Sequence, residues 1–430
     1  QPPPVGPIDS IAKFQQAFRD WGMTRKLPET IPFVGNGFDD SQLAEKRFPT
    51  RHDLDAVSET RPLLALHVSG HNDYDGSFVD NSDIVQQAVG AQLQWKARDA
   101  FTLIVSAGSN KDSSDNFLGD APAGFFASRR DTASVQADLA PAEGHTITVG
   151  ADWLRDRIAS DTPYDDKRRA DRAAFAQYQG RFGAQDVQLA LRRDDDDQFG
   201  GKTTGNAAWG LGFGDGWRVT AGYGNAFKAP TFNELYYPFF GNPALRPESS
   251  RTAEAGLAWR GERVGLHLDA FETRVRDLIA YDASLGLPNN LDEARLRGAE
   301  LRADGALFGW TVSGAASWLD AENRAAGANR GKDLPRRARE TARLDLDRAF
   351  GAFRLGLSGV AEGKRWDDVA NTRRLGGFAT LALRGEYRLA DAWTLQAGVA
   401  NVFDRRYETA AYYNQAGRTW TVAIRFDPGH

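Results

Sequence analysis

The stretch "RTWTVAIRF" (418–426) alternates apolar and polar side chains. One face would carry Trp420, Val422, Ile424 and Phe426, and the other would carry Thr419, Thr421 and Arg425. Successive side chains of a strand point to opposite faces, so a period of two predicts a β-strand. Because one face is apolar and the other is polar, the strand must separate an apolar environment from a wet one.

The same period recurs along the chain from about residue 84, in "TITVGADWL", "VQLALRRD", "RVGLHLDAF", "ARLDLDRAF" and "ATLALRGEYRL". Short turns such as "KARDA" and "LADAW" alternate with long polar loops. The loops are expected near 116–128, 160–172, 194–203, 229–249, 281–291, 320–335, 364–374 and 405–417. This pattern predicts an all-β fold of about seventeen antiparallel strands. Many of them exceed the roughly 9–11 residues that a β-strand needs to cross a bilayer.

The composition excludes several classes of protein. The chain has 430 residues, 26% of them charged, and a formal net charge of −5, which argues against nucleic acid as a partner. It has no cysteine, so a disulfide framework and a thiolate metal site are both excluded. No apolar run approaches the roughly 18–20 residues of a membrane-spanning helix.

Short turns at one end of the strands and long loops at the other are typical of a transmembrane β-barrel of the outer membrane. A soluble sandwich or propeller is the alternative, but the sequence shows no blade-length repeat. Tryptophans also fall near the expected strand ends, which suits interfacial girdles. They are Trp95, Trp153, Trp217, Trp259, Trp310, Trp393 and Trp420.

Three stretches carry more specific information: "YGNAFKAPTFNELYYPFFGNPALRPESSRTAEAGL", "NLDEARLRGAELRADG" and "LQAGVANVFDRRYETAAYYNQAGRTWTVAIRF". Together they resemble the β-barrel of TonB-dependent outer-membrane receptors over about residues 73–426. Within that family, "RRDDDDQFGGKTTGNAAWGLGF" before "YGNAFKAP" looks most like the vitamin B12 (cobalamin) transporter branch, although siderophore receptors share several of the motifs. The resemblance implies a bacterial outer-membrane receptor, surrounded by lipid, that captures a corrinoid or metal-chelate ligand. Such a receptor performs no covalent chemistry, so no catalytic residues are expected.

The long loop after "FKAP" supplies candidate substrate-binding residues. Exposed aromatic side chains on a loop suggest a rim that contacts ligand, although they could equally pack on neighbouring loops. The candidates are Tyr236, Tyr237, Phe239, Phe240 and Asn242.

Acidic residues near one expected loop form a candidate Ca²⁺ site, because Ca²⁺ takes several oxygen ligands. The candidates are Asp73, Asp75, Asp80, Asp112 and Asp115. The cobalamin branch resembles this in using loop aspartates for calcium; solvated loop acids are the alternative. "RRDDDDQFGG" (192–201) is expected to be a hydrated strand end, because neighbouring aspartates on a strand point to opposite faces.

The first 71 residues differ in kind. "IDSIAKFQQAFRDWG" predicts an amphipathic helix, and residues 8–71 resemble a fragment of the metal-dependent amidohydrolase superfamily. No HxH pair occurs among the six histidines, so no hydrolase activity is expected. The sequence therefore predicts a small α/β segment over 1–71 and the receptor barrel over 72–430.

The resemblance also implies a plug domain, a TonB box and about twenty-two strands. The sequence shows neither plug nor box, so we expect a barrel shortened on its N-terminal side that does not support energised import. A passive porin-like channel, an inactive amidohydrolase remnant and a soluble β-rich binding protein are the alternatives. Since single-chain bacterial barrels have even strand numbers, Leu63–Ser69 is predicted to serve as an eighteenth strand beside Ile84–Trp95.

Overall fold

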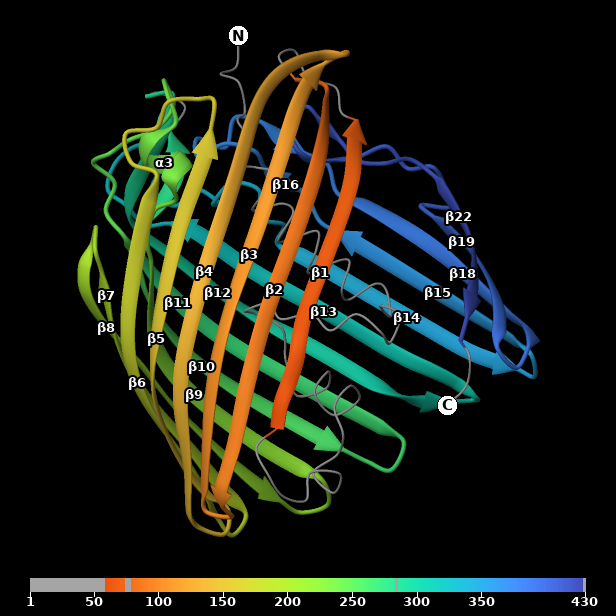
Figure 1. Ribbon diagram of the computed structural model, residues 1–430. Coiled ribbons are helices and arrows are strands. Elements are labelled where there is room, and N and C mark those ends of the chain that lie inside the picture. Colours follow the sequence, from red (N-terminus) through yellow and green to blue (C-terminus); the bar gives the residue numbers. More distant parts are fainter. Residues whose placement is uncertain (1–58, 74–78, 283–284, 428–430) are drawn as a thin grey trace. The chain divides into compact units, whose positions relative to one another are not determined.

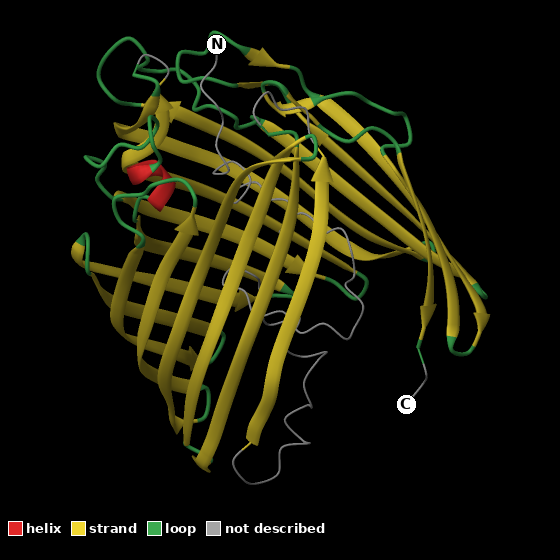
Figure 2. Cartoon of the chain, turned by 45° about the horizontal axis from the view of Figure 1, so that its top comes forward, coloured by secondary structure: helices red, strands yellow, loops and turns green. Residues whose placement is uncertain are grey.

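The computed structural model describes residues 59–73, 79–282 and 285–427, and the amphipathic helix predicted near the N-terminus lies outside them. The described chain divides into two compact units. Unit 1 comprises residues 59–180, 190–204 and 230–245, and unit 2 comprises 181–189, 205–229 and 246–427, apart from the gaps. The fold is all-β, with one short helix among the described residues (Figure 2). That helix is not long and apolar enough to cross a membrane.

Unit 1 is an antiparallel meander in which each strand pairs with the next one in the sequence. Figure 1 shows its first four strands side by side. The strands are β1 (Glu59–Asp73), β2 (Asn81–Arg98), β3 (Phe101–Leu118), β4 (Ala121–Ala142), β5 (His145–Ser160) and β6 (Arg168–Phe182). Helix α3 (Phe232–Tyr236) belongs to the same unit. The last residues of β6, together with β7 (Gln185–Asp196) and β8 (Gly200–Phe213), contribute to both units.

Unit 2 repeats the meander, again with sequential antiparallel neighbours. Its long strands are β9 (Trp217–Lys228), β10 (Glu248–Arg260), β11 (Val264–Asp282), β12 (Leu287–Leu307), β13 (Trp310–Asn323), β14 (Glu340–Phe350), β15 (Phe353–Glu362), β18 (Phe378–Ala390), β19 (Trp393–Ala400) and β22 (Thr419–Phe426). Two short hairpins lie in its loops: β16 (Arg365–Trp366) with β17 (Arg374–Leu375), and β20 (Glu408–Ala410) with β21 (Tyr413–Asn414).

The predicted extra strand is confirmed and is longer than expected. Residues Glu59–Asp73 form β1, which pairs antiparallel with β2 from Glu59↔Gln94 to Asp73↔Asn81. The strand passes without a break through the proposed boundary at residues 71 and 72. The segment from residue 59 onwards is therefore part of the sheet of unit 1.

Three of the predicted loops, 116–128, 194–203 and 281–291, are much shorter in the structure, because strands occupy most of their residues. The difference is largest in the first. Residues 116–128 were expected to form a long polar loop, but β3 and β4 continue through this region and meet in a turn at Gly119 and Asp120. Asp80 closes that turn, because its carboxylate accepts hydrogen bonds from the Gly119 backbone N–H at 2.9 and 3.0 Å. The polar residues of this region are therefore paired within a hairpin. Composition alone does not distinguish such a hairpin from a polar loop.

The two faces of the strands differ as the period of two predicts. In unit 1 the exposed side chains of one face are mainly aliphatic; they include Val105, Val135, Leu139, Ile147 and Val149. The opposite face is polar: Ser106 bonds Ser134 at 2.7 Å, and Gln136 and Thr148 both donate to Asp138. An exposed aliphatic face is the arrangement that lipid requires, and a polar face suits a wet interior.

Tryptophans lie close to strand ends, as predicted. Trp217, Trp310 and Trp393 each begin a strand, and Trp217 contacts Trp259 across the β9–β10 pair with ring centroids 6.3 Å apart. Trp393 packs on Phe426 of the last strand at 4.6 Å. Trp153 is the exception, because it lies in the middle of β5.

Candidate ligand-binding loops

The residues Pro230–Leu245, hereafter the aromatic loop, connect β9 to β10. The loop begins with helix α3, which has a capping box: the Thr231 side chain accepts from the Glu234 N–H, and Glu234 bonds the Thr231 N–H at 2.7 Å. Such a cap stabilises a helix end by about 1 kcal/mol. A five-residue helix needs that help together with tertiary packing.

The packing comes from a buried cluster within unit 1. Phe232 of α3 packs with Phe126, Ile158 and Tyr164, which come from β4, β5 and the β5–β6 loop. The Tyr164 hydroxyl donates to the Asn233 amide oxygen at 2.6 Å inside this cluster. Burial raises the pKa of Tyr164 above its ordinary value, so its hydroxyl keeps the proton that it donates.

An arginine ties the aromatic loop to the strands below it. The Arg169 guanidinium of β6 donates to the Pro230 carbonyl at 2.8 Å and lies over the Phe232 ring at 5.3 Å. It also lies 3.5 Å from the carboxylate of Asp196, which is buried. Arg169 therefore holds the loop through one backbone contact and one ring contact, while Asp196 of β7 pairs with its charge.

The predicted substrate-binding residues fall into two groups. Tyr236, Tyr237 and Phe240 form the packed base of the loop. The Tyr236 hydroxyl accepts from Gln198 Nε2 at 2.5 Å, and the Tyr237 ring contacts the rings of Tyr164 and Phe240 at 6.1 and 6.5 Å. Burial raises the pKa of both tyrosines, so these hydroxyls are neutral donors and acceptors.

Phe239 differs from its neighbours. Its side chain is fully exposed, and its backbone has φ 63°, a conformation that residues with a Cβ rarely adopt. Gly241 allows the tight return two residues later, because a Cβ there would lie 2.6 Å from the Leu235 carbonyl oxygen. Asn242 shapes the same turn, since its amide oxygen accepts from the Ala244 N–H at 3.0 Å. The packed base thus presents one aromatic ring to the surroundings.

The side chains of the candidate calcium residues that the structure describes do not point to a common ion position. Asp80 is engaged with the Gly119 turn, and the carboxylate of Asp112 accepts from Gln86 Nε2 at 3.0 Å. Asp115 is three residues from Asp112 on β3, so the two side chains point to opposite faces. Among the described residues no three His, Cys, Asp or Glu side chains gather to hold a metal. Asp75 and the Asp73 side chain lie outside the described part, so calcium binding stays a prediction.

The acidic run at 194–197 is only partly the hydrated strand end that was predicted. The side chains alternate as expected, but Asp194 and Asp196 are buried while Asp195 and Asp197 are not. Arg192 pairs with Asp194 at 2.8 Å and with Asp152 at 2.5 Å. The two buried aspartates therefore stabilise arginines on the polar face of the strands.

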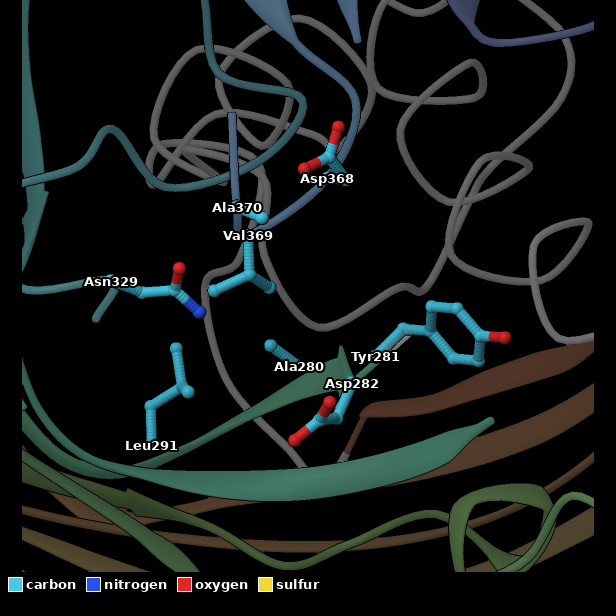
Figure 3. Close-up of a pocket in the computed structure, with 8 residues that line it drawn as sticks. All are labelled: Ala280, Tyr281, Asp282, Leu291, Asn329, Asp368, Val369 and Ala370. Carbon is cyan, nitrogen blue, oxygen red and sulfur yellow. The ribbon is translucent and has the colours of Figure 1, made fainter. Parts of the chain in front are cut away.

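Unit 2 has a small cavity beneath its loops (Figure 3). Its volume is about 130 Å³, and its lining residues are Ala280, Tyr281, Asp282, Leu291, Asn329, Asp368, Val369 and Ala370. Figure 3 shows Asn329, Leu291, Val369 and Ala280 around a common space, with the Tyr281 ring pointing away. Ligand pockets usually measure about 300–1,000 Å³. The cavity is therefore too small for a corrinoid or a ferric chelate.

The loops of unit 2 are fixed by their own contacts. Asp367 accepts from Arg336 Nε at 2.8 Å and from the Ala411 N–H at 3.0 Å, which joins three loops. Although burial raises the pKa of Asp368, backbone N–H donors of Thr372 and Arg373 lower it below its ordinary value overall. Tyr412 is exposed with φ 70°, and the Arg373 guanidinium lies 3.8 Å from its ring centre. Sequence reasoning did not single out this pair, because loop contacts between distant segments leave no periodic signal.

Long sequential strands with an exposed aliphatic face and a polar face define the class of transmembrane β-barrels. The family model "TonB dependent receptor-like, beta-barrel" matches residues 32–402, and the chain belongs to that family. The match begins well before residue 72, and nothing in the comparisons supports the amidohydrolase resemblance of residues 8–71, which stays a prediction.

Two relatives are named vitamin B12 transporter BtuB. The one from Photobacterium profundum is 27% identical over 377 residues, covering 85% of this chain and 61% of the relative. The one from Vibrio vulnificus is 27% identical over 396 residues, covering 87% and 63%. The chain thus spans about three fifths of the length of these relatives. Both are named as transporters.

Solved structures show the same fold. The copper transporter OprC has a TM-score of 0.71 at 20% identity, with 85% of this chain and 69% of that chain covered. The ferric enterobactin receptor PfeA from Pseudomonas aeruginosa has a TM-score of 0.67 at 18% identity, with 81% and 63% covered. At these sequence identities the structural similarity shows a shared fold and nothing further.

Proposed function

We propose that the chain is an outer-membrane receptor barrel that captures a large metal-chelate ligand of the cobalamin or siderophore kind. The names of the relatives support the transport class, and their 27% identity leaves the ligand open. The expectation that the barrel does not support energised import is part of this proposal, and it concerns these 430 residues alone, which span about three fifths of those relatives.

The observation that carries the proposal is the aromatic loop. Its base is ordered by the capping box, the buried cluster and Arg169, so Phe239 is presented without a large loss of loop entropy on binding. A fully exposed ring in an unfavourable backbone conformation has no role in packing. A ring of this kind can stack on the flat apolar or aromatic surface of a bulky chelate.

The test is binding of cyanocobalamin and of ferric enterobactin to the detergent-solubilised protein, measured by calorimetry. Phe239→Ala should weaken binding of the true ligand about tenfold, the loss expected when a stacked aromatic contact of about 1–1.5 kcal/mol is removed. Phe308→Ala is the matched control, because Phe308 is also exposed with positive φ but lies in the short β12–β13 turn. Binding of neither probe, or equal loss in both variants, would contradict the proposal.

A further inference from the structure

Four cations stand in one cross-strand row of unit 1. Lys111 of β3 pairs with Arg129 of β4, Arg129 pairs with Arg157 of β5, and Arg157 pairs with Arg168 of β6. Residues directly opposite in an antiparallel sheet share a face, so all four side chains project on the same side. Like charges in directly opposite positions destabilise a sheet. An anion bound to a row of four cations would therefore reduce the repulsion between them.

The row lies on the face that carries the exposed aliphatic side chains. The next row on this face lies two residues nearer the short turns and consists of Ser109, Asp131, Arg155 and Ala170. The row after that consists of Ala107, Ala133, Trp153 and Arg172. Continuing toward the short turns, the same face carries Val105 with Val135 and then Leu139 with Ile147. The cations thus border an apolar band at its end nearer the long loops.

The distance along the strand matches a membrane thickness. Lys111 is ten residues beyond Phe101, the first residue of β3 after the short turn. Transmembrane β-strands cross the hydrocarbon core with roughly 9–11 residues. If the short turn lies at one membrane surface, the row of cations lies at the headgroups of the other. Trp153 lies four residues before Arg157 on β5, between the row and the apolar band, and the Arg155 guanidinium lies 5.2 Å from its ring centre.

The local charge is poorly compensated. The three rows on β3–β6 that begin at Lys111, Ser109 and Ala107 contain six cations and one carboxylate, Asp131. Asp131 pairs with Arg129 at 2.9 Å, with Arg155 at 3.4 Å and with Arg157. Within the described part of the chain, Lys111, Arg168 and Arg172 have no ion pair with a carboxylate. These rows on β3–β6 therefore carry a net charge of five positive units, and a further carboxylate, that of Asp197 after β7, accepts from the Ala170 N–H at 3.0 Å at the edge of the second row.

Unit 2 provides an internal comparison. There the cross-strand row Glu272, Arg297 and Asp320 alternates in sign, and Arg297 Nε donates to Asp320 at 2.9 Å. The same fold can thus balance a charged row with its own residues. The unbalanced row in unit 1 is a feature of that surface and not a requirement of the architecture.

We propose that Lys111, Arg129, Arg157 and Arg168 bind the phosphate groups of a membrane lipid headgroup on the loop side of the bilayer. Each arginine guanidinium can donate two parallel hydrogen bonds to phosphate oxygens, and neighbouring arginines can bind two phosphates of one headgroup. The inference rests on the proposed function only in requiring that the chain lies in a membrane.

The experiment measures thermal unfolding of the purified 430-residue chain in dodecyl maltoside, with added diphosphorylated lipid A. Lipid A from which both phosphates have been removed, and inorganic phosphate, are the comparison probes. The midpoint should rise with diphosphorylated lipid A alone. In Arg129→Gln/Arg157→Gln the apparent affinity should fall about tenfold or more, since charge-assisted bonds to phosphate are lost.

The matched control is Arg130→Gln, which removes a neighbouring cation on the opposite face, where Arg130 pairs with Asp156. A second test variant, Lys111→Gln/Arg168→Gln, removes cations without an ion pair, so it should fold in lipid-free detergent as well as the parent. An unchanged lipid A response in both double variants, an equal response to dephosphorylated lipid A, or the same loss in the control would overturn the proposal. Chelate binding measured on the same samples tests the proposed receptor function separately.

Discussion

At the scale of single residues, the aromatic loop shows what sequence can and cannot predict. Four aromatic residues in "YYPFF" indicated a ligand rim as a group. The structure distinguishes three that pack from Phe239, which projects. The distinction depends on Phe126, Ile158 and Tyr164, which are more than sixty residues away in sequence. No local pattern encodes such partners.

Phe239→Gly should separate stability from binding. Glycine adopts positive φ without the penalty of about 1 kcal/mol that a side chain incurs, so the thermal midpoint should stay equal or rise slightly. Chelate binding should still weaken as in Phe239→Ala, because the ring is gone. A fall in the midpoint measured by circular dichroism would show that Phe239 packs against something in the folded protein.

Tyr164→Phe should loosen the base of the aromatic loop. The substitution removes the donor to the buried Asn233 amide oxygen, and an unpaired buried acceptor costs about 1–3 kcal/mol. Hydrogen exchange should speed up in α3 and remain unchanged in β2 and β3. Asn233→Ala, added to Tyr164→Phe, should cost less than the sum of the two single changes, since they share one bond. Additive effects would exclude that shared bond.

At the scale of elements, periodicity predicted strands well and their ends poorly. The alternation in "PLLALHVSG" was enough to expect a strand beside β2, and the pairing from Leu64↔Gly90 to Asp73↔Asn81 confirms it. The β3–β4 hairpin was missed, because its polar residues satisfy cross-strand partners instead of marking a loop. Asn116 of β3, for example, accepts from Ser82 of the neighbouring strand β2 and from Ser114 of its own strand.

Proline substitutions test the pairing of β1. Within unit 1, β1 pairs with β2 alone, so alternate backbone N–H groups of β1 point toward β2 and away from it. Of His67→Pro and Val68→Pro, one should therefore disrupt the pairing and the other should be tolerated much better. The readout is hydrogen exchange across residues 84–94 of β2. Equal behaviour of the two variants would contradict the observed pairing.

At the scale of the whole molecule, composition alone is that of a soluble protein, whereas the two-residue period predicts a membrane β-barrel. A charged fraction of 26% and a net charge of −5 are ordinary for a soluble protein. The strands place apolar residues on one face and polar ones on the other, which keeps the average hydropathy low while building a continuous apolar surface. The receptor family could be predicted because its motifs lie in strands and turns. The ligand could not, because its contacts lie in loops.

The adjacent residues Val135 and Gln136 of β4 test which face meets lipid. Val135 is exposed in the middle of the apolar band, and Gln136 Nε2 bonds Asp138 on the polar face at 2.9 Å. In lipid bilayers, Val135→Arg should destabilise the fold by about 2–4 kcal/mol, the cost of a cation on the lipid face near the midplane. Gln136→Arg adds the same charge to the wet face and should cost far less, because water and Asp138 surround it. The measurement is the equilibrium unfolding of both variants in bilayers of phosphatidylcholine. If Val135→Arg were tolerated as well as Gln136→Arg, the exposed aliphatic face would not lie in lipid, and a soluble β-rich fold would be the better description.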